Sequence, residues 1–270
     1  GARHTASGPP ARSRITKGVS MRQPLSILAT TVLLGILSCA RTEPPVTPTG
    51  STLPVKDLTL ISVGTMSVGE PSGLAYAPKT GTLYMVSDSR QEIFIIDTTG
   101  RVLSSIPVTA SDLEGIALSP NADTIYVVEE TASQITRFLP NGTKISSQPV
   151  LIRTDPKHAL EGITVNPDGH IIVLNEKTPT ALAEYSGTSE VRRLTLSETS
   201  DISDICYDAV TDAWWVVSDE SRRVLKYSRS GQLLGVWASP LEQGEGIAFI
   251  GDRLYLVSDS DAKFYVFARP

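Results

Sequence analysis

A five-fold internal repeat constrains the fold of this chain more than any other feature of its sequence. A short motif, in most copies Glu-Gly-Ile, recurs at spacings of 42, 47, 42 and 42 residues. Its five copies are Ser72-Gly73-Leu74, Glu114-Gly115-Ile116, Glu161-Gly162-Ile163, Ser203-Asp204-Ile205 and Glu245-Gly246-Ile247. An apolar run after each copy ends in an acidic residue, at Asp88, Glu130, Glu176, Asp219 and Asp259. Self-similarity at such a period is typical of a repeat architecture.

Each repeat unit is predicted to contain four short β-strands. In the first unit, residues 73–76, 82–86, 92–96 and 102–108 are rich in β-branched and aromatic residues, and turn sequences separate them. No segment after residue 38 shows the 3.6-residue period of an amphipathic helix. Four strands in a unit of this length form a propeller blade. The sequence therefore predicts an all-β fold, a five-bladed β-propeller.

The two ends of the repeat region predict how the ring closes. The last unit, residues 245–267, supplies only three strands, and residues 56–66 precede the first motif with the composition of a fourth. Pairing these segments closes the last blade with an N-terminal strand and covers two sheet edges. A β-sandwich is the alternative fold, but it does not explain the repeat.

Strand pairing predicts that the recurring acids lie at one end of the ring. Partners in an antiparallel hairpin have residue numbers with a nearly constant sum, so Ser72 and Asp88 flank a turn near Thr80. The motif and the acid that follows it therefore lie at the open end of each hairpin. Because the first strand of a blade is the innermost, we expect the motif glutamates to surround one mouth of the central channel.

We expect this acidic mouth to bind a divalent cation, either Ca²⁺ or Mg²⁺. Carboxylates crowded in this way repel one another unless they are protonated, hydrated or bound to a cation, and hard oxygen ligands suit these two ions. The predicted ligands are Glu114, Glu161, Glu245 and Asp204. The second-strand acids either support these ligands or accept hydrogen bonds from the backbone of the neighbouring blade; they are Asp88, Glu130, Glu176, Asp219 and Asp259.

The first residues of the chain are interpreted as an export signal. Residues 1–38 combine an upstream leader with a signal peptide whose apolar stretch is Leu25–Leu37, and the sequence Ile36-Leu37-Ser38-Cys39 resembles a bacterial lipobox. Lipidation at Cys39 is the expected result; an ordinary secretory signal with a coincidental cysteine is the alternative. Residues 39–54 read as a Pro/Thr-rich tether and 55–270 as the propeller domain. We therefore expect a membrane-anchored lipoprotein of the cell envelope, facing the periplasm or the exterior.

Charge narrows the range of partners. Residues 1–40 contain five basic residues and no acid, which leaves 19 basic against 29 acidic residues in the rest of the chain. A domain with this net charge repels phosphate backbones, so we expect no nucleic acid partner. We expect a monomeric domain whose ligand is a small molecule, a glycan or a protein.

The same motifs carry a resemblance to a known family. Residues 70–76, 82–88, 112–116 and 160–163 resemble the SdiA-regulated family of bacterial envelope proteins, and the likeness extends over roughly residues 56–268. The resemblance implies a propeller with an acidic axis and no settled biochemical activity.

A weaker likeness links the Glu-Gly motif to gluconolactonases and paraoxonases, in which a first-strand glutamate binds an axial calcium. That analogy implies Glu114, Glu161 or Glu245 as a metal ligand, with Asn175 beside it. Those enzymes have six blades, however. Esterase-like phytases share the Ser-Gly-Leu sequence, but no basic cluster for phosphate is visible in this chain.

Two functions follow as hypotheses, with a purely structural scaffold as a third. The first is a binding module whose channel mouth holds a divalent cation and an unidentified ligand. The second is a metal-dependent hydrolase, either phytase-like or lactonase-like, in which Glu130 or Glu176 activates water. The sequence assigns no catalytic residue and does not decide between them.

Overall fold

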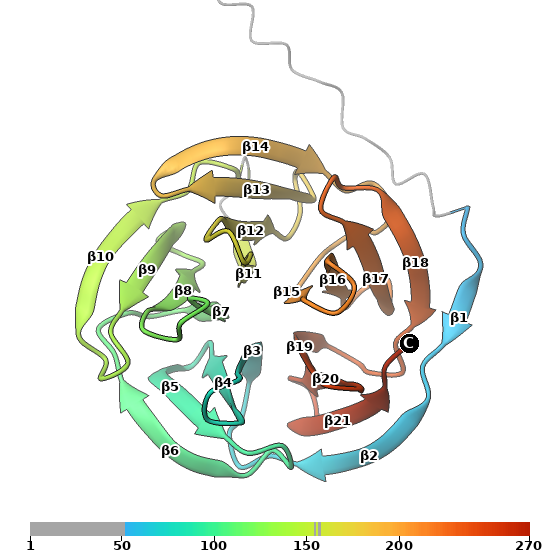
Figure 1. The fold of residues 1–270 in the computed structure, drawn as a ribbon, viewed down its shortest axis with the longest axis horizontal. Coiled ribbons are helices and arrows are strands. Elements are labelled where there is room, and N and C mark those ends of the chain that lie inside the picture. Colours follow the sequence, from blue (N-terminus) through green and yellow to red (C-terminus); the bar gives the residue numbers. More distant parts are fainter. Residues whose placement is uncertain (1–51, 154, 156–157) are drawn as a thin grey trace, which may run out of the picture. The chain divides into compact units, whose positions relative to one another are not determined.

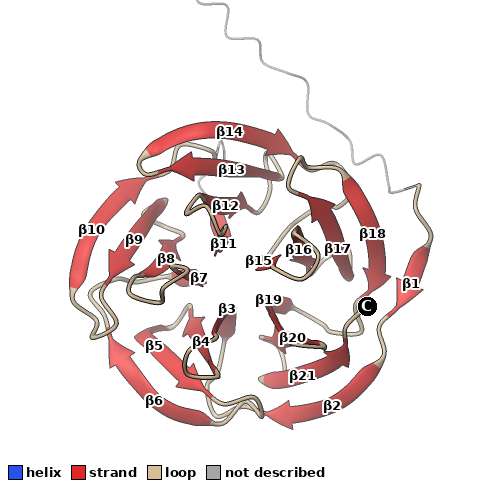
Figure 2. Cartoon of the chain, in the orientation of Figure 1, coloured by secondary structure: helices blue, strands red, loops and turns tan. Residues whose placement is uncertain are grey.

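The computed structural model describes residues 52–153, 155 and 158–270, and these residues form strands and loops (Figures 1 and 2). Within this part of the chain there is no helix of the length and hydropathy that crossing a membrane requires. The apolar stretch Leu25–Leu37 and the lipobox Cys39 lie outside the described residues, so their assigned roles stay predictions.

Five four-stranded antiparallel units surround a central axis (Figure 1). The first blade contains β3 (Pro71–Ala77), β4 (Thr82–Ser87), β5 (Arg90–Ile96) and β6 (Val102–Pro107). The second contains β7 (Leu113–Leu118), β8 (Ile125–Glu129), β9 (Gln134–Phe138) and β10 (Lys144–Pro149), and the third β11 (Leu160–Val165), β12 (Ile171–Asn175), β13 (Ala181–Ser186) and β14 (Ser189–Thr195). The fourth contains β15 (Asp204–Asp208), β16 (Ala213–Ser218), β17 (Arg223–Ser228) and β18 (Leu233–Ala238), and the fifth β19 (Gly244–Ile250), β20 (Arg253–Ser258) and β21 (Lys263–Ala268). The predicted five-bladed β-propeller is confirmed.

The ring closes through an N-terminal strand, as the sequence predicts. Strand β2 (Leu60–Thr65) pairs antiparallel with β21 and completes the fifth blade, with Val63 opposite Tyr265. A further short strand, β1 (Val55–Asp57), adds to the outer edge of the fourth blade in parallel with β18. The sequence analysis did not anticipate β1.

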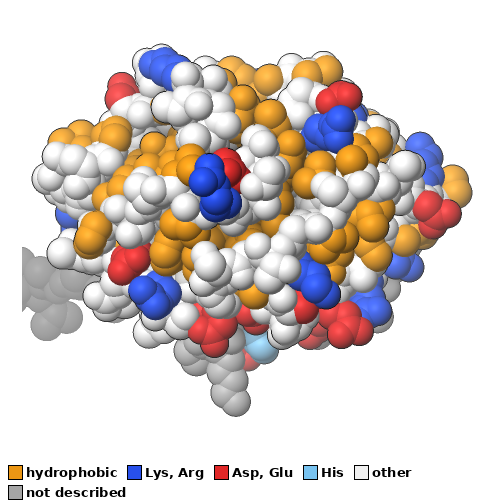
Figure 3. Space-filling model, turned by 90° about the horizontal axis from the view of Figure 1, so that it is seen from below, with side chains coloured by type: hydrophobic (Ala, Val, Ile, Leu, Met, Phe, Trp, Pro, Cys, Tyr) orange, Lys and Arg blue, Asp and Glu red, His pale blue; other side chains and the backbone are white. Residues whose placement is uncertain are grey.

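The hydrophobic core lies between neighbouring blades. Leu74 and Met85 of the first blade pack with Tyr255 and Phe264 of the fifth, and equivalent apolar clusters fill the other blade interfaces. Buried polar contacts join the blades as well, since the indole nitrogen of Trp214 donates to Asn166 Oδ1 at 2.9 Å. The outer strands show apolar side chains to solvent between charged ones (Figure 3); the exposed apolar residues include Leu60, Ile61, Val63 and Leu103.

Glycines bring the five innermost strands together at the axis. A Cβ atom added at Gly115 would lie 2.3 Å from the Glu161 carbonyl oxygen, and one at Gly73 would lie 2.8 Å from Gly115 Cα. Real Cβ atoms do not approach backbone this closely, so these positions require glycine. In the fourth blade the equivalent position is Asp204, which introduces a carboxyl group where the other blades have none.

Candidate functional site

One mouth of the channel opens into an acidic cavity. The cavity has a volume of about 220 Å³. Its lining contains ten carboxylates and one cation, Lys177. The carboxylates are Glu70, Asp88, Glu114, Glu161, Glu176, Asp201, Asp219, Glu220, Glu245 and Asp259. The structure thus brings the three motif glutamates into one cavity with four of the second-strand acids.

Two serines position two of the motif glutamates. Ser72 Oγ of the first blade donates to Glu114 Oε2 of the second at 2.9 Å, and the Ser203 hydroxyl of the fourth blade bonds the Glu245 carboxylate of the fifth. Each serine occupies the motif position that is glutamate in the other blades. The blades that lack a glutamate therefore hold the glutamate of the next blade.

Burial makes these glutamates difficult to ionise. Removal from water raises the pKa of Glu114 to about 8 and that of Glu245 to about 7. The pKa of Glu161 is raised well above its ordinary value by burial first and then by the charges of Glu114 and Glu245. A cation bound by one of these carboxylates would favour the charged form of that carboxylate. A divalent cation at this site would offset the repulsion between these carboxylates.

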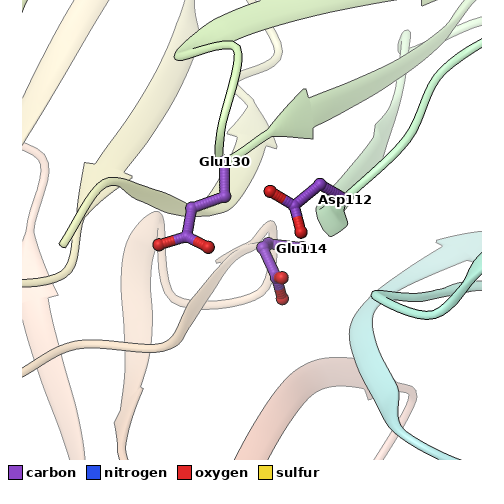
Figure 4. Close-up of side chains that lie close together, drawn as sticks. All are labelled: Asp112, Glu114 and Glu130. Carbon is purple, nitrogen blue, oxygen red and sulfur yellow. The ribbon is translucent and has the colours of Figure 1, made fainter. Parts of the chain in front are cut away.

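The closest group of carboxylates comprises Asp112, Glu114 and Glu130 (Figure 4). One oxygen atom of each lies within 4.8 Å of the others, and all three residues are half-buried. Burial, followed by the Asp112 charge, raises the pKa of Glu130. Three hard oxygen ligands at this spacing fit Ca²⁺ or Mg²⁺, which makes these residues the candidate metal ligands in the described part of the chain.

The sequence analysis missed Asp112, and it also missed Glu70, Asp201 and Glu220 of the cavity lining. Asp112 lies two residues before Glu114, in a left-handed backbone conformation with φ of 59°. Thr131 fixes its carboxylate, because the Thr131 amide donates to Asp112 Oδ2 at 2.8 Å and the Thr131 hydroxyl bonds the same atom. A signal was present in the repeat: the position two residues before the motif is acidic in three units, as Glu70, Asp112 and Asp201.

Asp204 occupies the axis beside the mouth. Its carboxyl oxygen Oδ2 accepts the amide of Leu74 at 3.3 Å and that of Ile247 at 3.0 Å, which links the fourth blade to the first and the fifth. The other oxygen, Oδ1, is buried and has no hydrogen-bond partner in the described structure. Burial raises the pKa of Asp204 well above its ordinary value. Among the predicted ligands, Asp204 alone does not line the acidic cavity.

The second-strand acids differ in what they bind. The carboxylates of Glu130 and Asp219 accept backbone amides of the following blade, from Ala159 and Gln243 respectively. Asp88 accepts the amide of Ser89 instead. These contacts join neighbouring blades at Glu130 and Asp219, and of these two residues only Asp219 lines the acidic cavity.

On one side of the mouth, carboxylates contact a histidine and a lysine. Glu176 Oε2 bonds His158 Nδ1 at 2.9 Å, and Glu176 Oε1 lies 2.7 Å from Lys177 Nζ, which also contacts Glu220 at 2.6 Å. Asn175 is fully buried and donates to the carbonyls of Lys177 and Pro179. Its side chain therefore shapes the loop that carries Glu176 and Lys177.

The match to known proteins is at the level of a family. Residues 61–268 match the sequence model of the SdiA-regulated family. The chain belongs to this family. The resemblance inferred from the motifs is thereby confirmed. No curated protein matches the chain significantly.

Solved propeller structures share the fold at low sequence identity. Glutaminyl cyclase from Myxococcus xanthus is 12% identical with a TM-score of 0.65, covering 79% of this chain and 97% of that one. The WD40 β-propeller domain of Doa1 is 14% identical with a TM-score of 0.50, covering 73% and 63%. Virginiamycin B lyase from Staphylococcus aureus is 13% identical with a TM-score of 0.48, covering 73% of this chain and 66% of the lyase chain. The first two likenesses show the fold alone.

Proposed function

We propose that this protein binds a divalent cation at its acidic mouth and uses it to hold a ligand in the cavity. The supporting observation is the convergence of Asp112, Glu114 and Glu130 within 4.8 Å. Ca²⁺ fits first, because it accepts irregular sets of carboxylate and water ligands, whereas Mg²⁺ requires near-octahedral geometry. The cavity of about 220 Å³ next to the ion admits one small group of a small molecule, a glycan or a protein.

We also propose that the protein is anchored in the cell envelope, as the sequence of residues 1–54 predicts. A lipid on Cys39 and the tether of residues 39–54 would hold the propeller at the surface of a membrane in the cell envelope. The acidic mouth would then be accessible to ligands outside the cytoplasm. Calcium sites of extracellular proteins often have dissociation constants of about 0.1–1 mM.

One observation favours a metal-dependent hydrolase as a second candidate. Glu161 lies in the same cavity as Glu114, no hydrogen bond from a described residue reaches its carboxyl group, and burial raises its pKa. A carboxyl group whose pKa is raised in this way can act as a general acid that protonates a leaving group. A phosphoester or lactone bound to the cation would supply that leaving group.

Thermal unfolding of the metal-free chain tests the cation site. An ion that binds only the folded state raises its stability, by about 2.7 kcal/mol at a hundredfold excess over the dissociation constant. We expect Ca²⁺ to raise the melting temperature of the native chain and of Glu190→Gln, which changes a carboxylate on β14 that pairs with Arg193 and does not line the acidic cavity. We expect no rise in Glu114→Gln. An equal rise in Glu114→Gln, or none in the native chain, would disprove the site.

A further inference from the structure

The ends of the innermost strands that lie away from the acidic mouth surround a second cavity. Its volume is about 400 Å³, and it is lined by the last residues of β3, β7, β11, β15 and β19 with the loops that follow them. No residue lines both this cavity and the acidic one. The motif glycines and Asp204 lie between the two cavities along these strands. The two mouths of the channel are therefore separate candidate sites.

The repeat places an apolar side chain from every blade around this second mouth. The residue four positions after the start of each motif copy is apolar or aromatic, half-buried and part of the lining. We call these residues the apolar ring: Tyr76, Leu118, Val165, Tyr207 and Phe249. The preceding residue is small in every blade, as Ala75, Ala117, Thr164, Cys206 and Ala248. The same period thus encodes acids at one mouth and an apolar ring at the other.

The charges at the second mouth cancel. Asp208 and Arg269 are the two charged residues of the lining, and Arg269 Nη1 lies 2.5 Å from Asp208 Oδ2. Arg269 also donates to the carbonyl of Gly251, and its guanidinium lies 4.4 Å from the ring centroid of Phe249. Because each charge already has a partner, the cavity offers little to a charged ligand. The rest of the lining is mainly apolar, with the hydroxyl groups of Ser119, Thr164, Tyr76 and Tyr207 among it.

We propose that the second mouth binds an uncharged, largely apolar small molecule that contains a ring system. The volume falls in the range of small-molecule pockets, which combine apolar walls with a few polar groups. Two tyrosines and a phenylalanine in the apolar ring provide faces and edges for a flat ligand. The Tyr76 hydroxyl makes no hydrogen bond to a described residue and can bond one polar atom of that ligand. A concave cavity walled by all five blades favours such a molecule over a flat protein surface.

The neutral dye N-phenyl-1-naphthylamine tests this proposal, because its fluorescence rises when it leaves water. We expect the full chain to bind it saturably, and Leu118→Arg to weaken that binding at least tenfold. Val165→Arg, on another blade, should act in the same way and covers the case in which Leu118→Arg does not fold. The matched control is Leu103→Arg, which places the same charge on an apolar residue of β6 that is 46% exposed; its dye binding should equal that of the native chain.

Several outcomes would overturn the proposal. Dye binding that is not saturable, or that survives both Arg substitutions in the apolar ring, would exclude a site at the second mouth. A dimer in sedimentation that dissociates in Leu118→Arg would assign the surface to a second copy of the chain instead. Glu114→Gln changes only the acidic mouth, so it should leave dye binding intact whatever the outcome of the calcium test.

Discussion

Glu114 and Glu245 have their raised pKa values because the fold buries them, and this links stability to pH. Their pKa values in the folded chain are about 8 and about 7, against an ordinary value of 4.5. At pH values between 4.5 and these raised pKa values, the folded state binds more protons than the unfolded state. The free energy of unfolding therefore falls as pH rises through this range. We expect the free energy of unfolding of the metal-free chain to decrease from pH 5 to pH 8 by a few kcal/mol, since one pKa unit corresponds to about 1.4 kcal/mol. Urea unfolding at several pH values measures this change.

The substitution Glu114→Gln separates the contribution of Glu114 to this pH dependence from that of the other carboxyl groups. Gln cannot ionise, so in Glu114→Gln the decrease between pH 5 and pH 8 should be smaller than in the native chain, while Glu190→Gln should keep the full decrease. Stability that rises across this window in the native chain would contradict the burial of these carboxyl groups.

At the scale of the strand, the motif glycines set how closely the innermost strands pack. A methyl group at Gly115 would meet the Glu161 carbonyl oxygen at 2.3 Å, whereas a methyl group at Gly69 would meet nothing within 4 Å. We expect Gly115→Ala to destabilise the chain by about 1–3 kcal/mol, the usual cost of overpacking. Gly69→Ala, the matched control, should change stability by less than about 0.5 kcal/mol. Equal melting temperatures for the two variants would show that the strands at the axis can separate without cost.

The strand is also the scale at which sequence reasoning succeeded and failed. The spacing of the motif and of the acids such as Asp88 predicted the hairpins and the acidic end of the ring, because hairpin pairing is a local property. Asp112 was missed because it lies before β7, in a left-handed backbone conformation whose side-chain direction strand alternation does not give, and because the acids two residues before the motif occur in only three units. The short strand β1 was missed because its parallel partner β18 lies far away in the chain.

For the whole molecule, closure of the ring depends on one strand from the N-terminal side. Strand β2 pairs with β21 from Leu60 opposite Phe267 to Thr65 opposite Lys263. Phe264 and Val266 of β21 belong to the core between the fifth and first blades. Without β2 this core would lose the strand that covers the edge of its sheet. Strand β1 contributes much less to the stability of the ring, because its three residues are exposed and add to a blade that is already complete.

Two truncations test this difference. A chain that begins at Leu58 lacks β1 and should still unfold in one cooperative transition, with a melting temperature lowered by about 2–4 °C for each kcal/mol lost. A chain that begins at Met66 also lacks β2 and should lose cooperative unfolding, because the fifth blade then has three strands and the ring has no closure. Calorimetry of both chains distinguishes the two roles. A sharp transition in the shorter chain would mean that packing between blades holds the ring without the closing strand.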